Sequence, residues 1–402
     1  MRNWTILCVC FYIFVNAIQI DFKYDLWTLL LVFASIPAIF SLLRHGSFFS
    51  FFHLMILVFF LTSLGISILI SEDRVKSALL SVQFIPAVLI YLLIIISFTK
   101  TKDIIHLYLA VSISVFVLGF EFVYALFFEY NVGHVDWISK TGIPAMVVKN
   151  DTVFLAIMSP LCLSLACLRP FHMLGVFAVF SLLLCLLGGG IFQSRITVLT
   201  MMASLSCFIA LAYDLKQGLI SAIIMLLLIL LIDVLMGCPL LYKFVENWNG
   251  SGRIPLWACA WEMFVESPII GNGLHTFGEY YTSYINSRLF PSWVGVDTRF
   301  IPWPHNLYLE VLAGQGIIGM SALLIFLYRS LTCLWPLRKS GDESIRLLGV
   351  ACFSSMVGFC FASLFELSFL RMWVVITIFF LSAVAMQLSN MSRLYDRRKI
   401  YE

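Results

Sequence analysis

Charged residues are scarce in this sequence, which excludes a water-soluble globular domain. They make up 12% of the 402 residues, whereas hydrophobic residues make up 61%. Soluble domains carry roughly 25% charged and roughly 45–50% apolar residues. The net charge of +3 is small and no long basic run accompanies it, so we expect no nucleic-acid partner.

The sequence also lacks the motifs of metal and nucleophile chemistry. It has no CxxC pair, and most of its 11 cysteines lie inside apolar runs, where they act as small hydrophobic residues. It has no HExxH, no paired Asp-x-Asp on the face that we take as external, and no Gly-x-Ser-x-Gly nucleophile elbow. We therefore expect no zinc site, no disulfide framework and no serine-hydrolase triad. We predict that the protein works without a metal or other cofactor.

Long apolar runs fill most of the chain, whose mean hydropathy is +1.00. About 20 apolar residues span a bilayer as a helix, and helices satisfy every backbone group within lipid. We therefore predict an all-α, polytopic integral membrane protein with about twelve spans. The expected spans are residues 4–20, 26–43, 51–70, 78–98, 104–128, 152–168, 173–191, 196–213, 218–237, 309–328, 347–365 and 372–390.

The distribution of Lys and Arg predicts how these spans are oriented. If the N-terminus is cytoplasmic, most basic residues of the short loops and of the C-terminal tail fall on the cytoplasmic face. We predict three parts: an N-terminal bundle of about nine spans (1–237), a large external loop (238–308) and C-terminal spans with a basic cytoplasmic tail (309–402).

A short amphipathic helix is predicted inside the large loop, within residues 251–268. Ser251 or Gly252 can cap it, Pro255 stands in its first turn, and Pro268 follows its end. Its apolar stripe consists of Trp257, Trp261, Phe264 and Val265. This pattern favours a helix that lies in the membrane interface.

Ionisable residues at the spans gather toward the external side. Arg195 opens one span there, and Glu366 and Arg371 flank the boundary between the last two. A transporter would instead place polar residues near the membrane midplane. His305 stands directly before a span, after the rigid lead Pro302-Trp303-Pro304, where a histidine is often interfacial or capping. Arginines beside one histidine form a set suited to binding phosphate and removing a proton.

Three segments resemble the O-antigen ligase and O-antigen polymerase superfamily of bacterial membrane glycosyltransferases. They are GRIPLWACAWEMFVESPIIGNGLHTF, with an arginine-led helix and a Gly-x-Gly turn; PHNLYLEVLAGQGIIG, which continues into the membrane; and FQSRITVL, with Ser-Arg at the external start of a span. The likeness is close over roughly residues 180–330, and elsewhere it concerns hydropathy and topology.

The resemblance implies a GT-C-like fold in the bacterial inner (cytoplasmic) membrane, with a large periplasmic loop and a periplasmic active face. The donor would be a glycan on undecaprenyl pyrophosphate. The acceptor would be the lipid A core in a ligase of lipopolysaccharide biosynthesis, which we favour, or another lipid-linked glycan in a polymerase. A protein O-oligosaccharyltransferase is less favoured, because nothing resembles the additional C-terminal domain of that branch. A polysaccharide transporter is also less favoured.

The positions that match the superfamily's functional residues are Arg195, Arg253 and His305, and, less closely, Glu366. By this resemblance the two arginines bind the pyrophosphate leaving group without a metal, and His305 takes the proton of the attacking hydroxyl. Glu366 would either orient the imidazole or bind sugar hydroxyls. Asn306, beside His305, is expected to bind substrate. Membrane lipids are the remaining expected partners.

Overall fold

The computed structural model describes residues 2–17, 28, 31–33, 35–36, 51–128, 152–168, 172–191, 195–235, 252–288, 290–291 and 294–401. Within these ranges the chain forms helices and no strand. Among the described residues, seven helices are long and apolar enough to cross a membrane, and four shorter apolar helices accompany them. The prediction of an all-α, multi-pass membrane protein is therefore confirmed.

A helix stands at the place of each expected span except 26–43, of which only residues 28, 31–33 and 35–36 are described, all of them helical. The span expected at 78–98 consists of a short helix and a longer one, because the chain turns at Val82 and Gln83. The helices of the bundle are α1 (Arg2–Ala17), α3 (Phe51–Ile70), α4 (Arg74–Ser81), α5 (Phe84–Ser97), α6 (Thr101–Phe128), α8 (Thr152–Leu168), α9 (Met173–Ile191), α10 (Arg195–Ala212), α11 (Leu215–Leu235), α15 (Leu307–Leu334), α16 (Glu343–Ser363) and α17 (Met372–Tyr401). A short 3-10 helix, η2 (Trp335–Lys339), links α15 to α16, and the large loop contributes α13 (Arg253–Glu266) and α14 (Phe277–Ser287).

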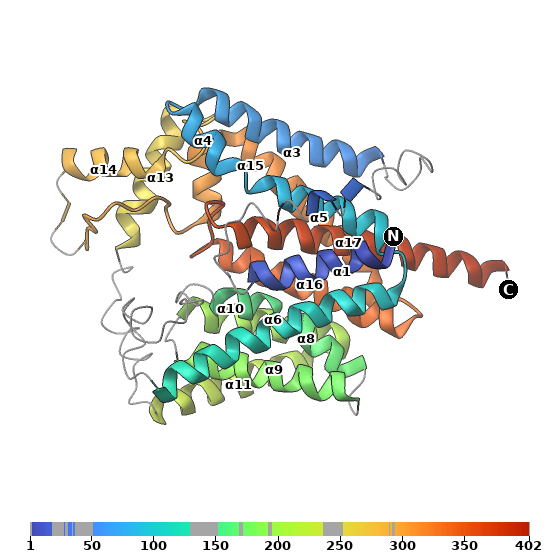
Figure 1. Ribbon diagram of the computed structural model, residues 1–402. Coiled ribbons are helices and arrows are strands. Elements are labelled where there is room, and N and C mark those ends of the chain that lie inside the picture. Colours follow the sequence, from blue (N-terminus) through green and yellow to red (C-terminus); the bar gives the residue numbers. More distant parts are fainter. Residues whose placement is uncertain are drawn as a thin grey trace.

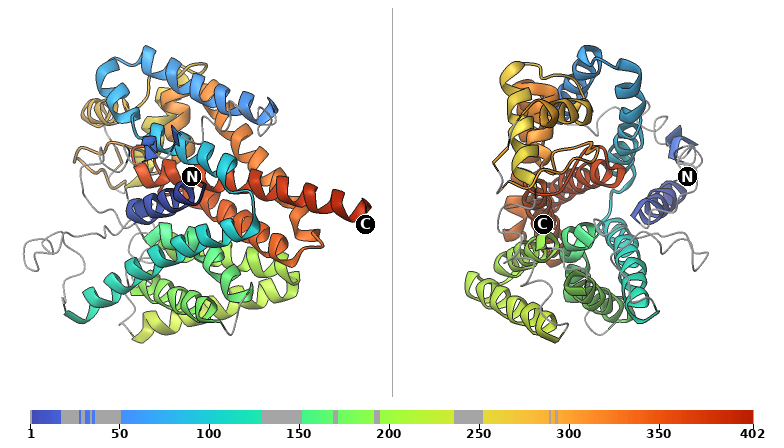
Figure 2. Two further views of the ribbon diagram at one scale, coloured as in Figure 1. Left: turned by 45° about the vertical axis from the view of Figure 1, so that its right-hand side comes forward. Right: turned by 90° about the vertical axis from the view of Figure 1, so that its left-hand side faces the viewer.

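Helices α16 and α17 run through the middle of the molecule. Figures 1 and 2 show α6 and α8–α11 on one side of this pair and α3, α4 and α13–α15 on the other. In α17, 94% of the apolar stretch is buried inside the protein, against 24% in α11. A helix that is apolar all round and buried belongs to the core, whereas an apolar helix with an open face suits contact with lipid. Helix α17 is therefore the central helix, and α11 is peripheral.

Both ends of the described chain lie at the same end of the bundle, opposite α13 and α14 (Figure 1). Arg2 fastens the start of α1 there: its Nε donates to the carbonyl of Ser97 at 3.0 Å, and its guanidinium pairs with Asp103. This placement agrees with the expectation that the two termini share one side of the membrane.

Helix α13 lies half against the bundle and half exposed. It follows Gly252, which has a φ of 74° and caps the helix without a side-chain hydrogen bond, and Pro255 stands in its first turn as expected. Of the predicted apolar stripe, Trp261 and Val265 are exposed, whereas Trp257 packs on Phe365 with ring centroids 6.4 Å apart. The other side of α13 forms a small second core with α14 and the start of α15. Ser251, the alternative cap, lies outside the described residues.

Helix α15 is interrupted at Gly316, whose φ of 60° and ψ of −158° belong to a region that is open almost only to glycine. The segment after α13 supplies the hydrogen bonds that the interrupted helix lacks. Asn272 N donates to Ala313 O at 2.9 Å, Gly273 N donates to Gly314 O at 3.0 Å, and Ile317 N donates to Pro268 O at 2.8 Å. Irregular backbone at membrane depth requires such partners. The two segments that carried the closest family resemblance are thus joined backbone to backbone.

Candidate active site

The turn between α16 and α17, residues 364–371, brings two charged side chains to the large-loop end of the bundle. Helix α16 ends at Ser363, and the amide of Glu366 still donates to Ala362 O at 3.0 Å. The far side of the turn is held from α15, where a carboxylate oxygen of Glu310 accepts from the amide of Phe369 at 3.2 Å. The side-chain amide of Gln83 also donates to the Phe369 carbonyl. Neighbouring helices therefore fix the turn that carries Glu366 and Arg371.

The carboxylate of Glu366 is the centre of an ion-pair cluster, and only 6% of the side chain is exposed. Its Oε2 accepts from Nη2 of Arg253 at 3.0 Å. Its Oε1 accepts from Nη2 of Arg371 at 3.4 Å and lies 3.4 Å from Nδ1 of His305. Three basic side chains from three separate elements therefore share one buried carboxylate.

The charges in this cluster perturb one another. Burial alone raises the pKa of Glu366, but the contacts with His305, Arg371 and Arg253 outweigh this effect and hold the pKa below its ordinary value. Burial lowers the pKa of Arg253; Glu366 opposes this effect, and the positive charge of Arg195 adds to it. Arg195, at the start of α10, thus lies close enough to Arg253 for their charges to interact. The cluster therefore concentrates positive charge, which suits an anionic ligand.

His305 directly precedes α15 in a left-handed backbone conformation, with a φ of 52°. Such a φ is uncommon for a residue other than glycine. The following residue, Asn306, caps α15, since its side-chain oxygen accepts from Leu309 N at 3.0 Å. The side chain of His305 is 26% exposed, so a substrate can reach it. The cap and the left-handed residue together aim the imidazole at Glu366 rather than along the helix.

Trp303 completes the surroundings of the imidazole. Its Nε1 donates to Nδ1 of His305 at 3.3 Å, and the two rings meet edge to face with centroids 5.5 Å apart. The guanidinium carbon of Arg371 lies 4.8 Å from the centre of the Trp303 ring, within the range of a cation–π contact. Arg371 therefore contacts both Trp303 and Glu366, the two side chains that meet His305.

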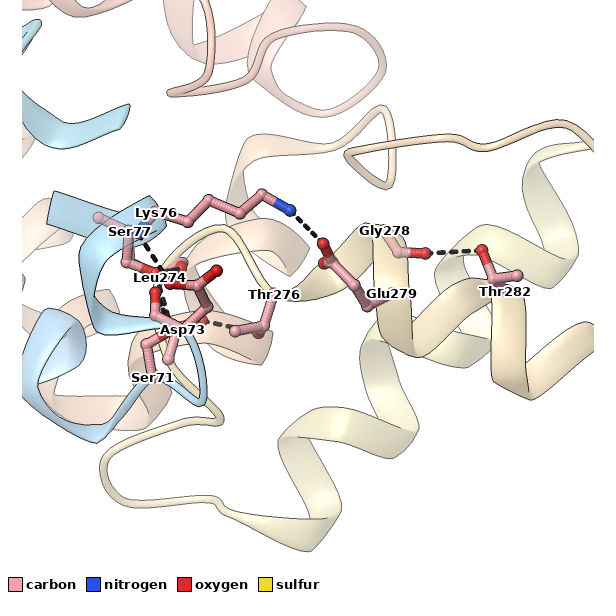
Figure 3. Close-up of polar contacts among 10 residues, drawn as sticks. Ser71, Asp73, Lys76, Ser77, Leu274, Thr276, Gly278, Glu279 and Thr282 are labelled. Carbon is pink, nitrogen blue, oxygen red and sulfur yellow. Dashed lines mark hydrogen bonds and ion pairs between the residues drawn. The ribbon is translucent and has the colours of Figure 1, made fainter. Parts of the chain in front are cut away.

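A polar network joins the large loop to α4 and to the turn that precedes α4, and Figure 3 shows its residues. The hydroxyl of Ser77 donates to Leu274 O at 2.6 Å and Lys76 pairs with Glu279 of α14. Close packing allows no side chain at Gly273, because a Cβ there would lie 2.5 Å from the Cα of Ser71. These contacts anchor the large loop to the bundle through residues that do not belong to the charged cluster.

The structure thus brings together four of the five residues that the sequence singled out. Arg253 and His305 contact Glu366 directly, and Arg195 acts on Arg253 through its charge. Asn306, expected to bind substrate, has its side-chain oxygen engaged as the helix cap. Among the described residues, no group of three His, Cys, Asp or Glu side chains is arranged to hold a metal ion.

Sequence reasoning did not select Arg371 and Trp303 as site residues. Arg371 was visible as a charge at a span boundary, and Trp303 as the tryptophan between two prolines directly before the histidine. The sequence thus marks both positions as unusual, but it does not indicate that Arg371 contacts Glu366 or that Trp303 contacts His305.

In a comparison with protein families, residues 152–324 match the model of the O-antigen ligase family. Comparison with curated proteins gives no match. The matched range contains Arg195, Arg253 and His305, whereas Glu366 and Arg371 lie beyond it.

Proposed function

We propose that this member of the O-antigen ligase and polymerase superfamily is a ligase-type glycosyltransferase of the bacterial inner membrane. It moves a glycan from undecaprenyl pyrophosphate to the lipid A core of lipopolysaccharide, on the periplasmic face. The observation that carries the proposal is the cluster of Arg253, Arg371, His305 and Glu366, with the charge of Arg195 close by, at one end of a membrane bundle.

The arginines suit the leaving group of this reaction. As the bond between the sugar C1 and the pyrophosphate oxygen breaks, its electron pair stays on the pyrophosphate, which gains negative charge. Guanidinium groups bind phosphate oxygens through paired N–H donors, and donors fixed in advance stabilise the charge as it forms. Arg253 and Arg195 therefore take the role that a metal ion has in other pyrophosphate chemistry, and we expect transfer without a metal.

His305 suits the other half of the reaction. The hydroxyl oxygen of the acceptor attacks C1 from the face opposite the leaving group, and its proton passes to Nε2 of the imidazole. Glu366 lies 3.4 Å from Nδ1 of the same ring, so it can hold the ring in place and stabilise the positive charge that the ring acquires. Of the two roles that the sequence left open for Glu366, these contacts support the orienting role.

The acceptor separates a ligase from a polymerase, and a gene deletion separates them in the cell. A strain without a ligase should make bare lipid A core on a lipopolysaccharide gel while lipid-linked polymer accumulates. Core carrying a single repeat would instead indicate the polymerase alternative. Unaltered lipopolysaccharide would contradict both.

The base assignment is tested with two histidines that share an unusual backbone. His305 and His275 have φ values of 52° and 63°, and both lie in the large-loop region, but only His305 contacts Glu366. Glutamine at either position meets a similar backbone strain, yet His305→Gln alone loses a proton acceptor. We expect His305→Gln to lose about 10²–10⁴-fold in transfer per folded molecule, and His275→Gln to lose far less. Normal specific activity of His305→Gln would remove the base from the mechanism.

A further inference from the structure

Nδ1 of His305 faces two neighbours with opposite requirements. Nε1 of Trp303 lies 3.3 Å away and Oε1 of Glu366 lies 3.4 Å away. An indole N–H can only donate a hydrogen bond, and an ionised carboxylate can only accept one. Trp303 is therefore satisfied when Nδ1 carries no proton, and Glu366 is satisfied when Nδ1 carries one. A single atom cannot serve both at once.

This competition decides which nitrogen of the ring can act as the base. A neutral imidazole carries one proton, on either Nδ1 or Nε2. With the proton on Nε2, Nδ1 accepts a hydrogen bond from Trp303, and Nε2 cannot take the hydroxyl proton of the glycan acceptor. With the proton on Nδ1, the ring donates to Glu366, and Nε2 is free to take that hydroxyl proton.

We propose that Trp303 is a positioning residue that sets the tautomer of His305: its indole N–H holds Nδ1 unprotonated in the resting enzyme, in competition with Glu366. The proposal rests on the proposed function for its catalytic consequence. When the base acts, the acceptor's hydroxyl proton moves to Nε2 while the Nδ1 proton stays bonded to Glu366, and the ring becomes an imidazolium. The indole bond therefore opposes both the active tautomer and the imidazolium.

The geometry around Trp303 supports a fixed donor. The residue stands between Pro302 and Pro304, whose rings restrict the backbone. Its own ring is held edge to face against the imidazole and beneath the guanidinium of Arg371. A side chain restrained in this way keeps its N–H directed at Nδ1.

The charged groups around the imidazole come from three further places. Glu366 and Arg371 belong to the turn after α16, Arg253 pairs with Glu366 from α13, and Asp297 lies close enough for its charge to interact with His305. Trp303→Phe alters none of these charges. It keeps an aromatic ring for Arg371 and removes the N–H, so it isolates the contribution of the indole hydrogen bond.

The test is ¹⁵N NMR of the full-length protein in lipid nanodiscs, with ¹⁵N-labelled histidine, because ring ¹⁵N shifts distinguish the tautomers. The His305 signals are those missing from His305→Gln. In the wild type, Nδ1 should be mainly unprotonated. In Trp303→Phe the ratio of tautomers should move about fivefold toward protonated Nδ1, the factor that corresponds to a hydrogen bond of about 1 kcal/mol. The acidic limb of the rate profile should move to higher pH in Trp303→Phe and to lower pH in Glu366→Gln.

Trp257→Phe is the matched control. Its indole nitrogen is buried and contacts no hydrogen-bond acceptor, and its ring packs on Phe365, next to Glu366. This variant should leave the His305 tautomer unchanged.

Two results would overturn the proposal: wild-type His305 with Nδ1 mainly protonated, or the same tautomer ratio in Trp303→Phe as in the wild type. The first needs no variant, so a misfolded Trp303→Phe leaves the test intact. Because the NMR measurement needs no transfer reaction, it also separates this inference from the proposed function. A tautomer that responds to Trp303 in a protein that transfers no glycan would refute the function alone.

Discussion

Glu366→Gln removes one negative charge from the centre of the site and preserves its shape. The glutamine oxygen can still accept one hydrogen bond, but Arg253 and Arg371 lose the negative charge that both of them pair with. With 6% of the Glu366 side chain exposed, water cannot take the place of the lost charge. The substitution should therefore destabilise the fold as well as impair transfer.

The size of the loss follows from how deeply each partner is buried. Removing one member of a buried ion pair costs about 3–5 kcal/mol of unfolding free energy. The side chain of Arg371 is 13% exposed and that of Arg253 is 29% exposed. Water can partly hydrate Arg253 when Glu366 is lost, so the loss of the carboxylate costs more at Arg371 than at Arg253. Because Arg253 can be partly hydrated and the glutamine keeps one hydrogen bond, we expect Glu366→Gln to lower the free energy of unfolding by about 3 kcal/mol, the lower end of that range.

The effect should depend on pH in a definite direction. The pKa of Glu366 in the folded protein lies below its ordinary value of 4.5, since His305, Arg371 and Arg253 outweigh the raising effect of burial. A carboxyl with a lowered pKa stabilises the fold above its unfolded-state pKa, and this contribution is lost as the pH falls through the folded-state value. The wild type should therefore lose its advantage over Glu366→Gln below about pH 4.5.

Thermal unfolding in detergent, followed across pH, measures both effects. Glu343→Gln is the matched control, because Glu343 pairs with Arg346 while 76% of its side chain is exposed, and exposed pairs contribute little. Equal unfolding temperatures for Glu366→Gln and Glu343→Gln at pH 7 would refute the reasoning. A difference between wild type and Glu366→Gln that persists unchanged in acid would refute the charge argument in particular.

Three further predictions concern the arginines, the packed glycines and the topology. Arg195→Lys and Arg253→Lys should each lose about 10²-fold or more in a reconstituted transfer assay, whereas Arg288→Lys, in an exposed pair with Glu262, should not. Equal tolerance at all three positions would mean that Arg195 and Arg253 have no special role in transfer. Gly271→Ala should destabilise the fold by about 3 kcal/mol or more, because φ is 75° there and an added Cβ would collide with the backbone of Gln315. Gly65→Ala is the control: an added Cβ there meets no atom within 4 Å, so this variant should unfold close to the wild-type temperature. In a variant without native cysteines, Ser283→Cys should react with an impermeant thiol reagent outside intact cells and Tyr401→Cys should not; the reverse would overturn the orientation.

The sequence by itself was sufficient to predict the membrane class and the positions of most helices. Length and hydropathy decide whether a run of residues can span a bilayer, and both are local properties. The arginine and histidine positions also followed from local segments: Arg253 begins a helix with Pro255 in its first turn and Pro268 just after its end, and His305 stands directly before α15. Such signals extend over a few tens of residues.

The connections between these segments came only from the tertiary structure. Glu366 binds Arg253 across 113 positions of the chain, and no local pattern encodes that pair. The Gly-x-Gly turn at 271–273 makes physical sense only beside the interrupted helix α15, whose carbonyls it satisfies. Asn306, which the sequence placed with the substrate, caps that same helix. Hydropathy determines that helices form in a membrane, but the packing of their side chains determines which ends meet, and so where the buried carboxylate gathers its arginines and its histidine.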